Sequence, residues 1–127
     1  MPRVVLQLLA GEFAICRLAP NEPVPPWAGS AVYFGQVRTA DELTVICPAA
    51  QVPAGVRQEA GWRLFKFQGP FEFSETGILS GVLAPLAAAG VVILAQSTFD
   101  TDYLFVKAGQ LDAAIRALGS AGHTVHL

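Results

Sequence analysis

Hydrophobic positions in the C-terminal half of the chain follow strand and helix periods in turn. The run WRLFKFQ at 62–68 has the character of a strand, and a Gly-Pro pair ends it. Ile78, Val82 and Leu86 then repeat at helical spacing before Gly90, a typical helix stop. After them we expect strands over 91–98 and 103–107 joined by a turn, a helix from 110 that ends before Gly122, and a strand over 123–127. This β-α-β-β-α-β order predicts an α+β, ferredoxin-like unit, with one antiparallel sheet and both helices on one face.

The stretch from Thr76 to Phe99 contains no ionisable side chain, which raises the question of a membrane span. A span needs about 20 mainly apolar residues in one continuous helix. Here serine, glycine, proline and glutamine interrupt the stretch, and Gly90 divides it into a helix and a β-branched strand. The pattern therefore predicts a soluble core and no membrane partner.

The N-terminal half has the pattern of a degenerate copy of the same unit. A shift of 60 residues aligns Gln36 with Gln96 and Glu42 with Asp102. The copy's strands are expected at 13–18, 31–39 and 43–47. Prolines in 20–28 exclude a regular first helix, and Trp27 is expected to fill the gap, with a binding role for this segment as the alternative. We therefore predict two tandem units, residues 1–61 (degenerate) and 62–127.

Composition narrows the classes of partner. Hydrophobic residues make up 53% of the chain and charged residues only 14%, so we expect the open sheet faces to be covered in a homodimer. The net charge of -2, without a Lys/Arg cluster, indicates neither nucleic-acid nor anionic-membrane binding. Cys16 and Cys47 lie in apolar runs and lack the spacing of metal ligands. We therefore expect them to be buried thiols of a cytoplasmic protein, and a disulfide is the alternative.

Three stretches of the sequence carry a family resemblance. They are residues 73–107, residues 62–70 ahead of them and residues 47–55 further upstream, with the motifs TGIL and STFDTDY as the most specific parts. In these stretches the chain resembles the small tandem ACT-domain proteins of bacteria, which are similar to the ACT units of the animal cytosolic arginine sensor family. The resemblance implies non-catalytic regulatory modules that bind an amino acid at interfaces between ACT units.

The resemblance also implies a set of ligand-binding residues. Asp102 matches a sensor position that contacts ligand, and the other matching contact positions are Glu75, Thr76, Gly77, Ile78, Leu79, Thr98 and Phe99. Two departures leave the ligand open: this chain has two units where the sensor has four, and the fold does not fix the residues at Glu75 and Thr76.

The residues themselves suggest the same chemistry. A helix start near Gly77 exposes unpaired N–H groups that suit a carboxylate, whereas Asp100 and Asp102 suit an ammonium group. Glu75 adds acidity for a cationic side chain such as that of arginine or lysine. Structural roles are the alternative: Ser74 or Thr76 as a helix cap, and Asp100 and Asp102 as turn formers.

Enzyme signatures are lacking in the sequence. It has no phosphate-binding glycine loop, no nucleophile elbow and no zinc-binding HExxH motif. His123 and His126 are far from both cysteines along the chain, and the two aspartates lack the further ligands of a metal loop. We therefore expect no catalysis, no metal and no cofactor. The two candidate functions are an amino-acid-binding regulatory protein and a ligand-free dimerisation or protein-interaction module.

Overall fold

The structure, a computed structural model, describes residues 2–127. Eight strands and two α-helices occur in this range, which confirms the predicted α+β class. The chain divides into two compact units. One consists of the segment up to Ala10 together with Arg63–Leu127, and the other of Gly11–Trp62.

The first unit contains the predicted β-α-β-β-α-β series. Its elements are β1 (Val5–Leu8), the later part of β5 (Gln58–Phe67), α1 (Ile78–Ala88), β6 (Ile93–Ser97), β7 (Asp102–Lys107), α2 (Leu111–Ser120) and β8 (Thr124–His126). Gly90 and Gly122 follow the two helices at φ +73° and +94°, a backbone region that favours glycine, and so they end the helices as expected. No helix in residues 2–127 is long and apolar enough to cross a membrane.

The sheet of this unit has one more strand than the β-α-β-β-α-β series predicts. Its order is β6-β7-β5-β1-β8, and β1 lies between β5 and β8, antiparallel to β5 and parallel to β8. Leu6 is paired with both Phe67 and Val125. The unit therefore includes an N-terminal strand that the sequence analysis had grouped with the other half of the chain.

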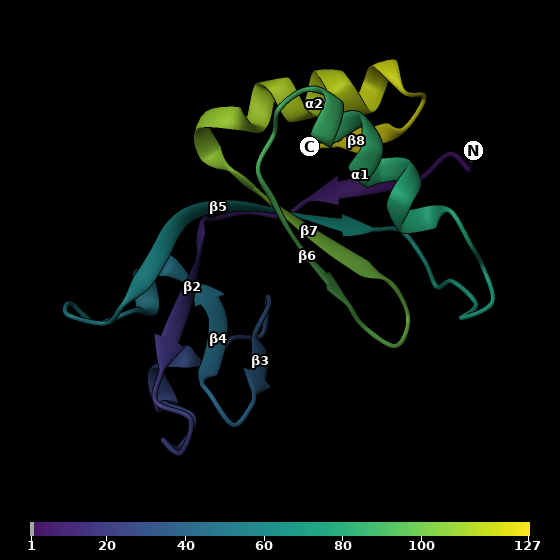
Figure 1. Cartoon of the computed structure of the whole chain (residues 1–127). Helices are drawn as coiled ribbons and strands as arrows, with labels where there is room; N and C mark the ends of the chain where they lie inside the picture. The colour runs from purple at the N-terminus through teal and green to yellow at the C-terminus, as the bar shows by residue number, and fades with distance from the viewer. Residues whose placement is uncertain (1) are drawn as a thin grey trace. The chain divides into compact units, whose positions relative to one another are not determined.

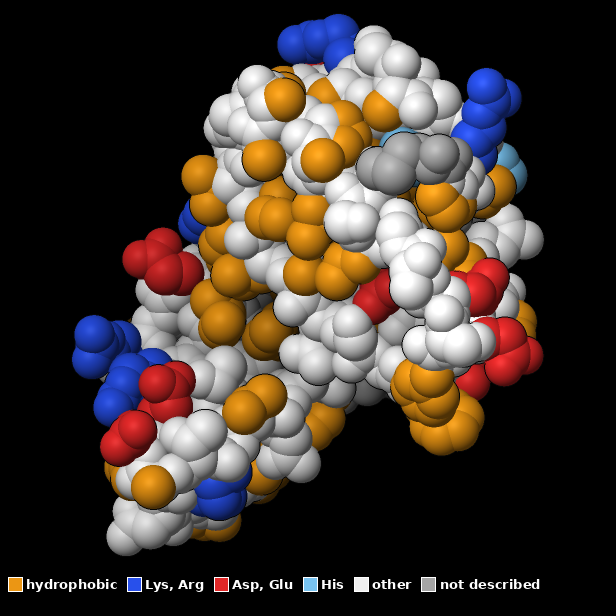
Figure 2. All heavy atoms as spheres, turned by 45° about the vertical axis from the view of Figure 1, so that its right-hand side comes forward, with side chains coloured by type: hydrophobic (Ala, Val, Ile, Leu, Met, Phe, Trp, Pro, Cys, Tyr) orange, Lys and Arg blue, Asp and Glu red, His pale blue; other side chains and the backbone are white. Residues whose placement is uncertain are grey.

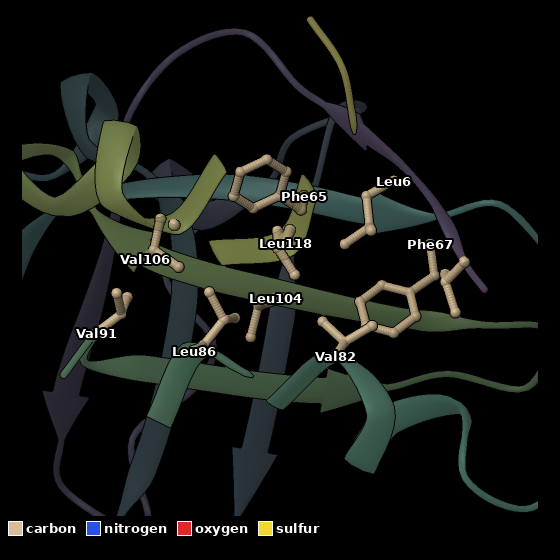
Figure 3. Packing of buried hydrophobic residues seen from close by; sticks show 11 residues of the cluster. Leu6, Phe65, Phe67, Val82, Leu86, Val91, Leu104, Val106 and Leu118 are labelled. Atoms are coloured by element: carbon tan, nitrogen blue, oxygen red, sulfur yellow. The ribbon is translucent and has the colours of Figure 1, made fainter. Parts of the chain in front are cut away.

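Both helices pack on the same face of this sheet and enclose its core (Figures 1 and 3). Most buried residues of the cluster come from both helices and from β1, β5 and β7, and two come from the segments just before β1 and β6; they are Val4, Leu6, Phe65, Phe67, Val82, Leu86, Val91, Leu104, Val106, Ala114 and Leu118. Burying each of the larger side chains contributes about 1.5–3 kcal/mol. The core thus fixes α1 against the sheet and sets the position of its first turn.

A buried histidine links three parts of this unit. His123, only 7% exposed, accepts a hydrogen bond at Nδ1 from the Val4 N–H (3.0 Å). Its Nε2 lies 2.8 Å from the carbonyl oxygen of Gly81 in α1, and with Nδ1 occupied as an acceptor, Nε2 is the donor. His123 therefore holds α1 to the segment before β1.

The second unit repeats the strand order of a ferredoxin-like fold without its helices. It contains β2 (Phe13–Leu18), β3 (Gly35–Arg38), β4 (Leu43–Pro48) and the start of β5, in the order β3-β4-β2-β5. Short 3₁₀ helices, Pro26–Ala28 and Ala49–Gln51, stand where the two α-helices would be. This confirms the predicted degenerate unit, and the prolines account for the first missing helix.

The core of the second unit is small and contains both cysteines. Its buried residues are Ala14, Cys16, Ala28, Leu43, Val45 and Cys47, and the half-buried Trp27 packs against them, in agreement with its expected filling role. Both cysteines are free thiols rather than a disulfide.

Each unit contains a hairpin turn of the same kind. Comparing the two turns corrects the alignment of the halves made from sequence. Thr39 donates its N–H to the Glu42 carbonyl (2.9 Å), as Thr98 does to Thr101 (2.8 Å). The equivalent residues are therefore Thr39 and Thr98, an offset of 59 rather than 60. Pairing Glu42 with Asp102 was wrong by one position. Two copies with so little sequence identity can be aligned almost equally well at either offset.

Candidate functional site

A cavity of about 280 Å³ lies in the first unit, where the start of α1 meets the β6–β7 turn. The loop before α1 forms its third wall. The lining residues come from these three segments: Phe71, Glu72, Phe73 and Glu75; Gly77, Ile78, Leu79 and Ser80; and Ser97, Thr98, Phe99, Asp100, Thr101 and Asp102. Segments about 20 residues apart in sequence thus form one site.

Most of the predicted ligand-binding residues meet at this cavity. Glu75, Gly77, Ile78, Leu79, Thr98, Phe99 and Asp102 all line it. Thr76 does not line it and is exposed. The structure therefore brings the two motifs together as expected and leaves one of the eight residues outside.

The first turn of α1 presents main-chain donors rather than a side-chain cap. Gly77 is the N-cap residue, and no side chain caps the helix, so neither Ser74 nor Thr76 has the capping role considered above. Gly77 has φ +79°, where a residue with a side chain is strained. A Cβ there would lie 3.6 Å from Pro2, an ordinary contact, so backbone conformation is what requires glycine. The N–H groups at the start of such a helix attract anions.

The β6–β7 turn is held by threonines rather than by aspartates. Thr98 Oγ1 donates to the Thr101 carbonyl (3.0 Å), and Thr101 Oγ1 donates to the Phe67 carbonyl (2.8 Å) in β5. Because Thr98 has this structural role, its match to a contact position carries less weight. The Asp102 carboxylate accepts a hydrogen bond from the Ser97 hydroxyl through Oδ1. Its other oxygen accepts no hydrogen bond from residues 2–127 and is available to a ligand.

The loop before α1 is closed by reciprocal bonds within it. Glu75 Oε2 accepts the Glu72 N–H (2.7 Å), and the Glu75 N–H donates to the Glu72 carbonyl (3.0 Å). Phe71 donates its N–H to the Asp100 carbonyl (2.8 Å), which joins the loop to the turn. Glu75 therefore shapes the wall of the cavity as well as adding charge to it.

Two exposed aromatic rings flank the cavity. Phe73 and Phe99, which are 77% and 80% exposed, contact each other edge to face with ring centroids 5.0 Å apart. Such exposure is unusual for phenylalanine. This pair is referred to below as the aromatic rim.

The charge of the cavity has one sign. Among residues 2–127, its lining contains four carboxylates, those of Glu72, Glu75, Asp100 and Asp102, and no lysine, arginine or histidine. Acidic and hydrophobic side chains lie next to each other on the face shown in Figure 2. A ligand with a net positive charge suits this lining, provided that its own carboxylate points to the helix start.

The cysteines and histidines show no catalytic arrangement among residues 2–127. Burial raises the pKa of the Cys16 thiol to about 11, with the neighbouring Cys47 adding to the shift, and burial also raises the pKa of Cys47. Protonated thiols are poor nucleophiles. Both ring nitrogens of His123 are engaged by main-chain groups. No group of three or more His, Cys, Asp or Glu residues suited to a metal ion occurs in the described chain.

Sequence reasoning missed several lining residues. Phe71, Phe73, Glu72, Ser80 and Ser97 all line the cavity. The unusual FEFSE segment, with two aromatics in a polar loop, was the available signal for three of them. Ser80 follows from helix geometry, because it lies in the first turn of α1.

Comparisons with known proteins agree with this architecture. The ACT domain family model matches residues 57–120, and the model of another family's N-terminal domain matches residues 11–55. No curated protein gives a significant sequence match.

Solved structures extend the comparison to the whole chain. An Agobacterium tumefaciens protein is 42% identical over 98% of this chain and 93% of that one, with a TM-score of 0.94. A Vibrio cholerae protein of unknown function, described as a possible transport protein, has a TM-score of 0.71 at 19% identity, over 93% of this chain and 89% of that one.

A regulatory subunit shows the same fold at lower identity. The ligand-free regulatory subunit of aspartate kinase from Thermus thermophilus has a TM-score of 0.61 at 13% identity, over 92% of this chain and 97% of that one. The resemblance to animal arginine sensors stays a prediction. The matched family model covers half of the chain, and the chain therefore belongs to the ACT-domain family.

Proposed function

We propose that this protein is a non-catalytic regulatory protein that binds a cationic amino acid, such as arginine or lysine, in the cavity between the start of α1 and the β6–β7 turn. The observation that carries the proposal is the polarity of that cavity. Main-chain donors of a helix start line one wall, and an Asp102 oxygen that has no partner among residues 2–127 lines another. These groups are complementary to the two ends of an amino acid.

The ligand's orientation follows from these charges. Its carboxylate lies on the main chain around Gly77 and Ile78, where N–H groups and the positive end of the helix dipole converge. Its ammonium group or cationic side chain lies at Asp102, and Glu75 adds to the negative potential. The reverse orientation would direct the ligand's carboxylate at the acidic wall and is disfavoured.

A second copy of the chain completes this site in our proposal. Phe73 and Phe99 expose large apolar surfaces beside the cavity, and α1 and β6 carry no charged side chain. Exposed apolar surface next to a polar site is typical of an interface. Ligand binding between two copies would then stabilise the dimer, which is a simple route from ligand concentration to regulation of a partner protein.

The test begins with a screen for the ligand. Thermal unfolding is measured with each of the twenty standard amino acids, because a ligand that binds only the native state raises the melting temperature. We expect arginine or lysine to give the largest shift. Titration calorimetry then compares the wild type with Asp102→Asn, which keeps an acceptor for Ser97 and removes the charge.

The matched control is Asp112→Asn, which removes one exposed carboxylate outside the cavity. Loss of a desolvated charge pair at Asp102 should cost about 2–5 kcal/mol of binding free energy, and the control should cost little. Equal affinities of the wild type and Asp102→Asn, with folding confirmed by circular dichroism, would exclude this site.

The alternative function is a ligand-free dimerisation or protein-interaction module, which the aromatic rim favours. It predicts that no amino acid shifts the melting temperature. It also predicts that light scattering finds a dimer, which Phe99→Ser dissociates. A dimer with no amino-acid response would select this alternative.

A further inference from the structure

A second cavity, of about 340 Å³, lies on another side of the β6–β7 turn. Lys66 of β5 and Tyr103 of β7 contribute to its lining. Phe65, Phe67 and Leu104 belong to the core that faces the helices. Since side chains alternate along a strand, Lys66 and Tyr103 project from the opposite face of the sheet. The cavity is therefore separate from the helix start.

Two opposite charges line this cavity without pairing with each other. Within residues 2–127, the Lys66 ammonium and the Asp100 carboxylate take part in no hydrogen bond or ion pair. Here the two groups remain apart across one concave space.

Hydrogen bonds hold the remaining walls together. The turn is fixed by the Thr98 and Thr101 hydroxyl bonds, and the Phe71–Asp100 main-chain bond ties it to the loop after β5. The half-buried side chain of Tyr103 flanks the space. A cavity of this volume lies within the usual range for small-molecule sites, roughly 300–1,000 Å³.

We propose that this second cavity binds the zwitterionic head of a small neutral amino acid, with its carboxylate on Lys66 and its ammonium group on Asp100. A simple carboxylate would pair with Lys66 but be repelled by the negative charge of Asp100. A simple amine would pair with Asp100 but be repelled by the positive charge of Lys66. A zwitterion satisfies both groups at once. The pairs are exposed, so the affinity is modest, in the millimolar range.

This site goes beyond the proposed regulatory site and does not depend on it. The first cavity has four carboxylates and no cationic side chain, which suits a cationic ligand, whereas the second has one charge of each sign. Thr98, Asp100 and Thr101 line both cavities, but the free oxygen that defines the first site belongs to Asp102.

The experiment is a ¹⁵N–¹H NMR titration of the full chain with L-alanine. We expect the amide signals of Lys66, Gln68 and Tyr103 to shift and those of Ile78 and Leu79 to stay. Propionate and ethylamine, each carrying one charge of the zwitterion, should bind at least about tenfold more weakly, since each leaves one protein charge unsatisfied.

Variants decide the assignment. Lys66→Met and Asp100→Asn should each weaken L-alanine binding by about tenfold or more. Lys107→Met is the matched control, because Lys107 lies further along β7 and does not line the cavity; it should bind L-alanine as the wild type does. Unchanged affinity in Lys66→Met, or shifts confined to the start of α1, would overturn the proposal. Failure here leaves the arginine titrations of Asp102→Asn unaffected, so the two sites are judged separately.

Discussion

Replacing His123 by alanine tests how the first turn of α1 is held in place. The imidazole connects the Val4 N–H to the Gly81 carbonyl of α1. Gly81 in turn donates its N–H to the Gly77 carbonyl (3.0 Å), at the helix start that lines the first cavity. Alanine removes both bonds of the ring and leaves a space in the core.

The magnitude follows from the two main-chain groups that lose their partner. An unsatisfied buried polar group costs about 1–3 kcal/mol. With His123 only 7% exposed, water reaches these groups poorly, so we expect His123→Ala to lower the free energy of unfolding by about 2–5 kcal/mol. His123→Asn, which retains an acceptor near the position of Nδ1, should lose less.

The assay is urea denaturation followed by circular dichroism, with the m-value compared among variants. His126→Ala is the control, because His126 is exposed at the end of β8, three residues after His123, and should change stability by less than about 0.5 kcal/mol. If His123→Ala were as stable as His126→Ala, the ring would not be holding α1, and the reasoning from its two bonds would be refuted.

Three further substitutions or conditions test other parts of the structure. Gly77→Ala should destabilise by about 1–2 kcal/mol in the same assay, because φ +79° strains a residue with Cβ; no loss would show that the helix start rearranges. Thr101→Val should cost about 1–3 kcal/mol through loss of its bond to the Phe67 carbonyl, and a neutral result would contradict the buried geometry. Burial raises the pKa of Cys16 to about 11, so the protonated thiol contributes its full stabilisation below pH 9. As the pH rises from 9 through 11, the free energy of unfolding should fall by about 2–3 kcal/mol. A Cys16→Ala variant should lack this component in alkaline denaturation.

The elements of the fold were accessible from sequence because each has a strong local signal. The spacing of Ile78, Val82 and Leu86 located α1, and Gly90 located its end. The place of β1 was not accessible in the same way. Its pairing with β5 and β8 joins residues more than 50 positions apart, and no local pattern encodes that choice of partner.

The candidate site was predicted in outline and not in its details. Charge and helix-start chemistry pointed to Asp100, Asp102 and Gly77, since these depend on residue type and local conformation, and the family resemblance selected Asp102 from the two aspartates. The role of Thr98 in the turn depends on main-chain geometry, and the approach of Phe71 to the β6–β7 turn depends on tertiary packing. Neither leaves a trace in residue spacing.

The central place of β1 has a consequence for how the protein is made. The chain forms β1, then the whole of the second unit, and only afterwards the strands between which β1 lies. The parallel pairing of Val5 with Thr124 requires β8, whereas residues 11–62 form one contiguous compact unit. During synthesis the smaller unit is therefore expected to form first, while β1 lacks its β8 neighbour until residues 124–126 have been made. Expression of residues 62–127 alone would leave β8 without its neighbour and should give an incomplete sheet.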